Sequence, residues 1–217
     1  MNPHLTTRLT GEFLGTGLLV MAVVGSGAMA QQLSTDVGVQ LLANSLATVA
    51  ALTSLIWMFG PISGAHFNPV VTLAQCRLAG HPWRQLVPYA VAQTAGGITG
   101  AVMANAMFGL DLFGPSTKIR EGGDIWLGEV VATATLLFVI HLIGKSNMTL
   151  VPVAVGIWIG GAYWFTSSTS LANPAVTIAR SFTESFAGIA PSSVPMFIVM
   201  QIIGLAFAIP LIKLLNR

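Results

Sequence analysis

The chain has 217 residues, of which 54% are hydrophobic and only 7% are charged. Soluble domains carry about 25% charged residues, so this composition excludes an ordinary soluble protein and indicates a membrane protein. The formal net charge of +2 rests on few groups, and the absence of a basic patch with interleaved aromatics excludes a nucleic-acid-binding surface. A single cysteine, Cys76, excludes an intrachain disulfide and a cysteine-rich metal site.

Six apolar stretches approach the roughly 20 residues that a membrane-spanning helix needs. In chain order we expect these spans at about 9–30, 38–59, 84–108, 125–144, 150–167 and 193–215. The first stretch imitates a secretory signal, because Arg8 precedes it and Ala28-Met29-Ala30 looks like a cleavage site. We interpret it as an uncleaved helix, since it is long, contains Glu12 and completes the first half of an internal repeat.

Two shorter segments follow the second and the fifth span, and each begins with Asn before Pro, at Asn68-Pro69-Val70 and at Asn173-Pro174-Ala175. Asn is a preferred N-cap and Pro is tolerated at the first helical position, so each motif predicts a helix start. The first segment covers about 11 residues, or roughly 16 Å, which is half of a ~30 Å hydrocarbon core. We expect two half-length helices that enter the bilayer and meet at its centre, a pattern that indicates a solute pathway.

The two halves of the chain repeat one another. Gly11-Glu12 in the first span matches Gly128-Glu129 in the fourth. Gln93-Thr94-Ala95-Gly96 in the third span matches Gln201-Ile202-Ile203-Gly204 in the sixth. Three spans per half is an odd number, so the halves must insert with opposite orientations, which predicts an inverted repeat.

The motifs resemble those of a known family of membrane channels. The segment Ser63-Gly64-Ala65-His66-Phe67-Asn68-Pro69-Val70 resembles the first Asn-Pro-Ala signature of the aquaporins, or major intrinsic proteins, and Asn173-Pro174-Ala175 resembles the second. The resemblance covers essentially the whole chain. It implies an all-α membrane protein with six transmembrane helices and two re-entrant half-helices, arranged as an inverted repeat in the aquaporin fold. We expect a single channel domain over 1–217, with repeat halves at about 1–110 and 120–217, assembled as a homotetramer.

The distribution of basic residues predicts the orientation. If both termini are cytoplasmic, the inner side holds six basic residues, which are Arg8, Arg77, Arg84, Lys145, Lys213 and Arg217. The outer side then holds Lys118, Arg120 and Arg180. This excess obeys the positive-inside rule, so we expect a multi-pass protein with cytoplasmic termini.

Two acidic residues, Glu12 and Glu129, fall inside predicted spans. A carboxylate within the membrane is costly and is by default a functional hypothesis. One interpretation is a proton relay in an ion-coupled secondary transporter. The other is a structural brace, in which each carboxylate accepts backbone N–H bonds from the loop that carries its half-helix. The aquaporin resemblance implies the brace.

The resemblance also implies how a pore would work. Asn68 and Asn173 would offer side-chain N–H donors to a neutral solute at the membrane centre. The pore-lining backbone would come from the two approach loops, at Gly64, Ala65, His66, Ser170, Leu171 and Ala172. Two converging helix N-termini oppose cations and break a proton wire, so transport would be passive. No acidic or cysteine partner lies at metal-ligand spacing from His66 or His141, and we expect no metal and no cofactor.

The expected selectivity filter departs from the family pattern. Aquaporins nearly always carry Arg directly after the second Asn-Pro-Ala, where this chain has Val176. The family's spacing puts Thr48, Gly161 and Ser170 at the other ring positions, which predicts a wide ring without an aromatic or a charge. Arg180 follows Val176 by one helical turn. It either leans back toward the outer mouth or snorkels to the lipid headgroups.

This filter most resembles the aquaporin-like channels of bacterial arsenic-resistance operons, which are related to aquaglyceroporins. That resemblance implies the bacterial inner membrane and a channel for small neutral solutes, with trivalent arsenic hydroxide and methylated arsenicals favoured over glycerol and water. The alternatives are a general water and glycerol facilitator, or an ion-coupled transporter that uses Glu12 and Glu129. We do not expect an enzyme, because the cluster Ser167-Ser168-Thr169-Ser170 has no Gly-x-Ser-x-Gly context and no histidine base in a plausible partner span.

Overall fold

The computed structural model describes residues 3–216, and all regular secondary structure in this range is helical. The six long helices are α1 (Leu5–Leu33), α2 (Val37–Ser63), α4 (Leu86–Phe108), α5 (Gly123–Phe138), α7 (Val151–Phe165) and α9 (Val194–Leu215). A π-helical turn over Val139–Ile143 continues α5 into α6 (Gly144–Ser146). The two half-helices are α3 (Pro69–Leu78) and α8 (Pro174–Ala179). Single 3-10 turns cover Trp83–Gln85, Met148–Leu150, Arg180–Phe182 and Pro191–Ser193.

Each of the six predicted spans is confirmed as a long helix. Five helical segments are long and apolar enough to cross a membrane. Helix α4 falls short of that criterion because it carries the fully buried amides Gln93 and Asn105 and several glycines. Helix α2 runs past the predicted residue 59 to Ser63, where Gly64, with a φ of 93°, ends it in the left-handed conformation.

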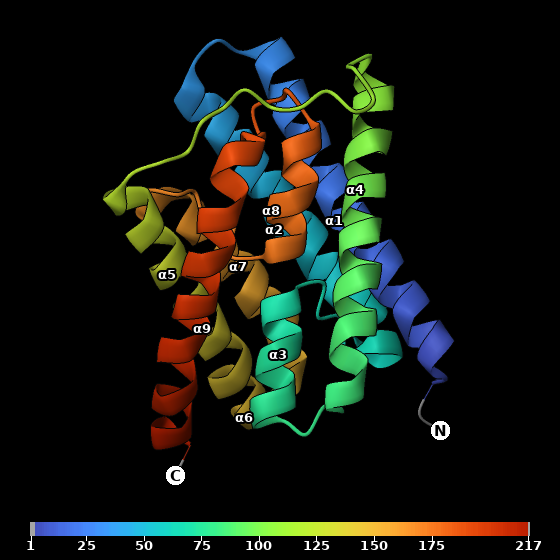
Figure 1. The fold of residues 1–217 in the computed structure, drawn as a ribbon, viewed down its shortest axis with the longest axis vertical. Helices are drawn as coiled ribbons and strands as arrows, with labels where there is room; N and C mark the ends of the chain where they lie inside the picture. Colours follow the sequence, from blue (N-terminus) through green and yellow to red (C-terminus); the bar gives the residue numbers. More distant parts are fainter. Residues whose placement is uncertain (1–2, 217) are drawn as a thin grey trace.

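The half-helices lie end to end in the middle of the molecule (Figure 1). Helix α8 lies above α3, and their N-termini face each other. Around them α1 packs against α2 and α4, while α5 packs against α7 and α9. The second set of contacts repeats the first, as an inverted repeat requires, and the predicted all-α architecture is therefore confirmed.

Backbone contacts at glycines hold the long helices together at equivalent points of the two halves. A Cβ built on Gly96 would fall 2.1 Å from the carbonyl oxygen of Phe13, and one built on Gly204 would fall 2.7 Å from that of Val130. Such small residues let helix backbones approach closely in lipid. The matched glycines of the sequence repeat therefore serve as packing positions.

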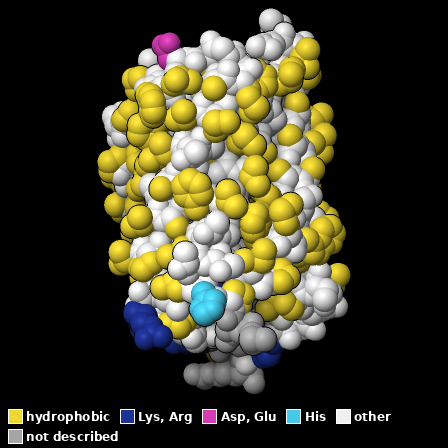
Figure 2. Space-filling view, turned by 90° about the vertical axis from the view of Figure 1, so that its right-hand side faces the viewer, with side chains coloured by type: hydrophobic (Ala, Val, Ile, Leu, Met, Phe, Trp, Pro, Cys, Tyr) yellow, Lys and Arg dark blue, Asp and Glu magenta, His cyan; other side chains and the backbone are white. Residues whose placement is uncertain are grey.

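The outer surface suits a lipid bilayer. Figure 2 shows hydrophobic side chains over the middle of one face, with Lys and Arg at the end near the chain termini. The first and last described residues lie at that same end (Figure 1). Arg217, one of the basic residues counted for the orientation, lies outside the described residues.

Candidate functional site

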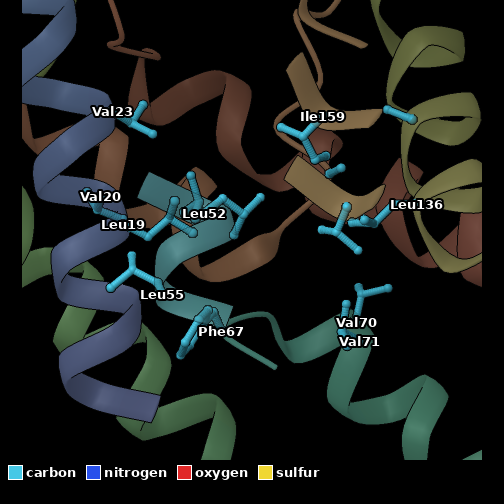
Figure 3. Close-up of a cluster of buried hydrophobic side chains, with 14 of the residues drawn as sticks. Leu19, Val20, Val23, Leu52, Leu55, Phe67, Val70, Val71, Leu136 and Ile159 are labelled. Atoms are coloured by element: carbon cyan, nitrogen blue, oxygen red, sulfur yellow. The ribbon is translucent and has the colours of Figure 1, made fainter. Parts of the chain in front are cut away.

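A cavity of about 1110 Å³ follows the line of the two half-helices. It extends from Lys145 and Lys213 near the C-terminus, past Asn68 and Asn173, to Arg180. Much of its wall is apolar. Figure 3 shows Leu19 and Leu52 on one side of this space and Leu136 and Ile159 on the other, and all four side chains line the cavity.

The two motif asparagines join the halves of the repeat at the centre of the cavity. Asn68 Nδ2 donates to the carbonyl oxygen of Ala172 at 2.7 Å, and Asn173 Nδ2 donates to that of Phe67 at 2.8 Å. An amide nitrogen has two hydrogens. One is used in each bridge, which leaves one donor per asparagine for a solute.

The same asparagines cap the half-helices through their side-chain oxygens. Asn68 Oδ1 accepts from the backbone N–H of Val70 at 2.9 Å. Asn173 Oδ1 accepts from Ala175 at 3.0 Å and from Val176 at 3.3 Å. Pro69 and Pro174 follow as the first helical residues, as the sequence predicted. The caps fix each side chain so that its nitrogen points toward the loop of the other half of the repeat.

Glu12 holds the loop before α3. Its Oε1 accepts from Ser63 Oγ at 2.6 Å and from the backbone N–H of His66 at 3.0 Å. Its Oε2 accepts from the backbone N–H of Phe67 and from Gln93 Nε2, both at 2.7 Å. The carboxylate is fully buried and does not line the cavity. These are the contacts expected of a brace.

Glu129 makes equivalent bonds in the second half. Its two oxygens accept from the backbone N–H groups of Leu171 and Ala172 at 2.9 Å and from Gln201 Nε2 at 2.7 Å. Both braced loops contain non-glycine residues with left-handed backbone, which costs about 1–3 kcal/mol per residue. These residues are Ala65, Phe67, Thr169, Ser170 and Ala172. The carboxylates therefore compensate for strained loops that carry the pore backbone.

Two threonines extend the repeat and were missed by the sequence analysis. Gln93 Nε2 donates to Thr72 Oγ1 at 3.0 Å, and Gln201 Nε2 donates to Thr177 Oγ1 at 3.0 Å. Each hydroxyl then donates to the carbonyl oxygen of its motif asparagine. The available signal was a Thr four residues after the Asn in both motifs.

The structure brings three of the four expected ring residues to the cavity. Thr48, Ser170 and Val176 line it, but Gly161 does not. Gly161 lies on the exposed face of α7, where a Cβ would meet only Phe165 of its own helix within 4 Å.

Tyr163 lines the cavity from α7 instead, and its hydroxyl lies 3.2 Å from Thr48 Oγ1. Residues two positions apart in an α-helix are separated by about 200° around the helix axis, so Gly161 and Tyr163 face opposite ways. The cavity wall beside Thr48 therefore includes an aromatic side chain, which the sequence did not predict.

Arg180 lies at the upper end of the cavity. Its side chain is 3% exposed and lines the cavity, so it does not snorkel to headgroups. Its Nε donates to the carbonyl oxygen of Ala187. The sequence left both directions open, and the structure selects the one toward the mouth.

The loop between α4 and α5 adds two further cations that the sequence analysis did not place at the site. Arg120 Nε donates to the carbonyl oxygen of Gly188 at 3.1 Å, and Lys118 Nζ donates to that of Phe186 at 3.0 Å. Burial, with Arg120 and Arg180 close by, lowers the pKa of Lys118 to about 8. Burial and the neighbouring Arg180 lower the pKa of Arg120 to about 9. Their approach depends on how a loop folds back, for which the sequence has no local signal.

Histidines gather near the opposite end of the cavity. His66 lines the cavity, and its Nδ1 lies 3.1 Å from Thr72 Oγ1. The ring of His81, in the α3–α4 loop, is 4.9 Å from that of His66 and 4.8 Å from that of Tyr89. Burial and the nearby Arg8 lower the pKa of His81. Within residues 3–216, no three His, Cys, Asp or Glu side chains are grouped so as to hold a metal ion.

Comparisons with known proteins agree with this geometry. The family model described as "Major intrinsic protein" matches residues 2–163. Aquaglyceroporin AqpS of Rhizobium meliloti is 46% identical over 209 residues, which cover 96% of this chain and 90% of that protein. Glycerol uptake facilitator protein 3 of Lactiplantibacillus plantarum is 30% identical over 178 residues, 73% of this chain and 72% of that protein. The X-ray structure of the aquaglyceroporin from Plasmodium falciparum shares the fold, with a TM-score of 0.72 at 19% identity, over 99% of this chain and 96% of that chain.

Proposed function

Because the chain belongs to the major intrinsic protein family and is an aquaglyceroporin-type membrane channel for small solutes such as glycerol or water, we propose that its favoured cargo is trivalent arsenic hydroxide, together with methylated arsenicals. The observation that carries the proposal is the side chain at Val176. It lines the cavity without a donor or a charge, at the position where the family usually has Arg. A solute with methyl groups or a third hydroxyl then meets more space at this level than an arginine would leave, and it meets no fixed cation there.

The chemistry of the cavity fits a small, neutral, partly apolar solute. Apolar side chains line much of the wall, while donors are concentrated at Asn68 and Asn173. A polyhydroxylated solute such as As(OH)₃ replaces part of its hydration with bonds to these amides and to loop carbonyls at Gly64, Ala65 and Leu171. Its apolar side meets the hydrophobic wall. The positively charged side chains at the mouth repel cations that approach the pore.

The buried carboxylates support passive flow over ion coupling. Glu12 and Glu129 are both 0% exposed, lie outside the cavity lining and accept three or more hydrogen bonds each. A proton relay needs a carboxylate that exchanges protons with the pathway. We therefore assign both residues as braces and propose no coupling to an ion gradient.

We further propose that residues 1–217 form one channel domain, with halves at about 1–110 and 120–217, in the bacterial inner membrane with cytoplasmic termini. The first and last described residues lie at the end of the molecule that also holds the start of α4, helix α6 and the end of α9 (Figure 1). These segments carry Arg84, Lys145 and Lys213, which supports this orientation. A homotetramer is proposed from the family resemblance.

Swelling of proteoliposomes tests the function. Water, glycerol, arsenite and a methylated arsenical are compared with empty liposomes of the same lipid, with and without an imposed proton gradient. We expect arsenite and the methylated arsenical to enter faster than in empty liposomes, without dependence on the gradient. If only glycerol and water entered, the protein would be a general water and glycerol facilitator. Accumulation that depends on the proton gradient would favour the ion-coupled transporter.

A further inference from the structure

The α4–α5 loop is tied across the upper end of the molecule (Figure 1). Residues 109–122 run over the ends of the helices toward α5. The backbone N–H of Ala190 donates to the carbonyl oxygen of Lys118 at 2.7 Å, and that of Arg120 donates to Ser193 Oγ at 3.0 Å. The loop is thereby fixed to the segment between α8 and α9, and its side chains are held in defined positions.

Three consecutive carbonyl groups in that segment each accept a hydrogen bond from a different cation. The pairs are Lys118 Nζ with Phe186 O at 3.0 Å, Arg180 Nε with Ala187 O, and Arg120 Nε with Gly188 O at 3.1 Å. Two elements far apart in the sequence thus deliver three positive charges to one short turn, and of the three side chains Arg180 lines the cavity while Lys118 and Arg120 lie behind the lining.

The hydrogen bonds recorded for these three cations all go to neutral oxygens. Besides the carbonyls, Arg120 Nη1 donates to Thr169 Oγ1 at 3.4 Å. Two carboxylates act on this cluster from nearby, Glu184 on Lys118 and Glu129 on both arginines, but their hydrogen bonds go to other groups. Glu184 accepts from the backbone and hydroxyl of Thr117, and Glu129 holds the loop before α8. Three clustered charges with neutral partners repel one another, and a bound anion relieves that repulsion.

Arg180 also has donors to spare. A guanidinium carries five N–H donors in a planar fork. Of the nitrogens of the Arg180 side chain, only Nε has a hydrogen-bond partner among the described residues. The two terminal nitrogens are not fully buried. The side chain is 3% exposed and faces the cavity. Its free fork is therefore fixed by burial and accessible from the cavity.

We propose that the outer mouth contains a binding site for a small oxyanion, formed by the guanidinium group of Arg180, which lines the cavity, with Arg120 and Lys118 adding positive charge beside it. A guanidinium fork matches two oxygens of one trigonal or tetrahedral oxyanion, which a spherical halide does not provide. An oxyanion at this site sits in the solute path and slows the flux of neutral solutes. The site rests on the proposed function only in taking the cavity as that path.

Glycerol swelling in phosphatidylcholine vesicles tests the site, with inorganic phosphate as the probe on both sides and chloride at equal ionic strength as the reference. We expect phosphate to slow the flux of the wild-type channel and chloride to leave it unchanged. Arg120→Gln removes one charge and should raise the half-inhibitory phosphate concentration by about tenfold, an energy of ~1.4 kcal/mol. Arg120→Lys keeps the charge and should retain most of the inhibition.

Arg84→Gln is the matched control, because it removes an exposed positive charge from the opposite end of the molecule. Its inhibition by phosphate should equal that of the wild type. A thermal shift of the detergent-solubilised channel by phosphate, lost in Arg120→Gln, gives a readout that does not depend on flux. The anion could come from free phosphate or from the phosphate of a lipid headgroup, and vesicles with phosphatidylglycerol separate these two sources. If a headgroup occupies the site, free phosphate should have no effect in phosphatidylglycerol vesicles and should still inhibit in phosphatidylcholine vesicles.

Two results would overturn the proposal. One is equal inhibition by chloride and phosphate in the wild type. The other is a wild-type channel for which phosphate changes neither the flux in phosphatidylcholine vesicles nor the unfolding temperature in detergent. Neither result concerns the cargo, because the ranking of arsenite against glycerol is measured without phosphate.

Discussion

Gly96 lies directly against Phe13, so closely that a Cβ on the glycine would fall 2.1 Å from the phenylalanine carbonyl oxygen. Phe13 follows the brace residue Glu12 in α1, and Gly96 is one turn after Gln93, which bonds to that carboxylate. The close contact of α1 with α4 thus sets the distance over which the brace network forms.

Gly96→Ala should destabilise the channel, because the new methyl group meets backbone rather than a flexible side chain. Overpacking of this kind costs about 1–3 kcal/mol. Thermal unfolding of the detergent-solubilised protein measures it, with Gly123→Ala as the control, since a Cβ at Gly123 has no neighbour within 4 Å. Equal unfolding temperatures for the two variants would show that α1 and α4 do not touch here.

Much of the fold could be predicted from the sequence because its signals are local. Asn followed by Pro marks each half-helix start, and uninterrupted hydropathy marks the spans. The rotation of α7 is not local. It depends on Gly156 and Gly160, where added Cβ atoms would fall 2.1 Å from Thr53 Oγ1 and 2.3 Å from Val49 Cγ2 of α2. Counting residues back from the second motif therefore selected Gly161, while packing against α2 turns Tyr163 inward.

Thr72→Val should weaken the first half-helix, because it keeps the shape but removes the hydroxyl that bonds Gln93 and the carbonyl of Asn68. A buried donor left without its partner costs about 1–3 kcal/mol. Thr72→Ser keeps the hydroxyl and should retain most of the stability. The two unfolding temperatures, measured side by side, check this. A Val variant as stable as the Ser variant would mean that the network does not support the half-helix.

Glu12→Gln should destabilise the channel without creating or abolishing any dependence on a proton gradient. Each oxygen of Glu12 accepts two hydrogen bonds, so the amide nitrogen of Gln must face two donors. The cost is on the order of 2 kcal/mol or more. Glu121→Gln, at an exposed loop position, is the charge-matched control. Gradient-driven accumulation in the wild type that disappears in Glu12→Gln would instead identify a transporter.

Gly161→Val should leave the flux of every solute unchanged, because Gly161 is on the exposed face of α7. Tyr163→Leu should change selectivity, since it removes the hydroxyl that lies 3.2 Å from Thr48 Oγ1 and reshapes the cavity wall. Relative swelling rates for glycerol and a methylated arsenical measure both. If Gly161→Val, and not Tyr163→Leu, abolished the flux of the methylated arsenical, the ring that the family spacing predicts would be correct.

Val176→Arg tests the proposed cargo most directly. Val176 is 6% exposed, lines the cavity and lies one helical turn before Arg180. An arginine there narrows the pore and adds five fixed donors beside an existing cation. Arg180 carries the same charge one turn away, so the unfolding temperature of the variant is measured first to establish that it folds.

We expect Val176→Arg to keep water flux, to reduce arsenite modestly and to reduce the methylated arsenical strongly. Val176→Met adds volume without charge and separates narrowing from the cationic effect. The order of solute sizes is diagnostic, because misfolding would depress all fluxes together. If the largest solute passed Val176→Arg at the wild-type rate, Val176 would not lie at the constriction. The narrowest part of the path would then be at the level of Arg180, whose guanidinium lines the cavity directly after α8.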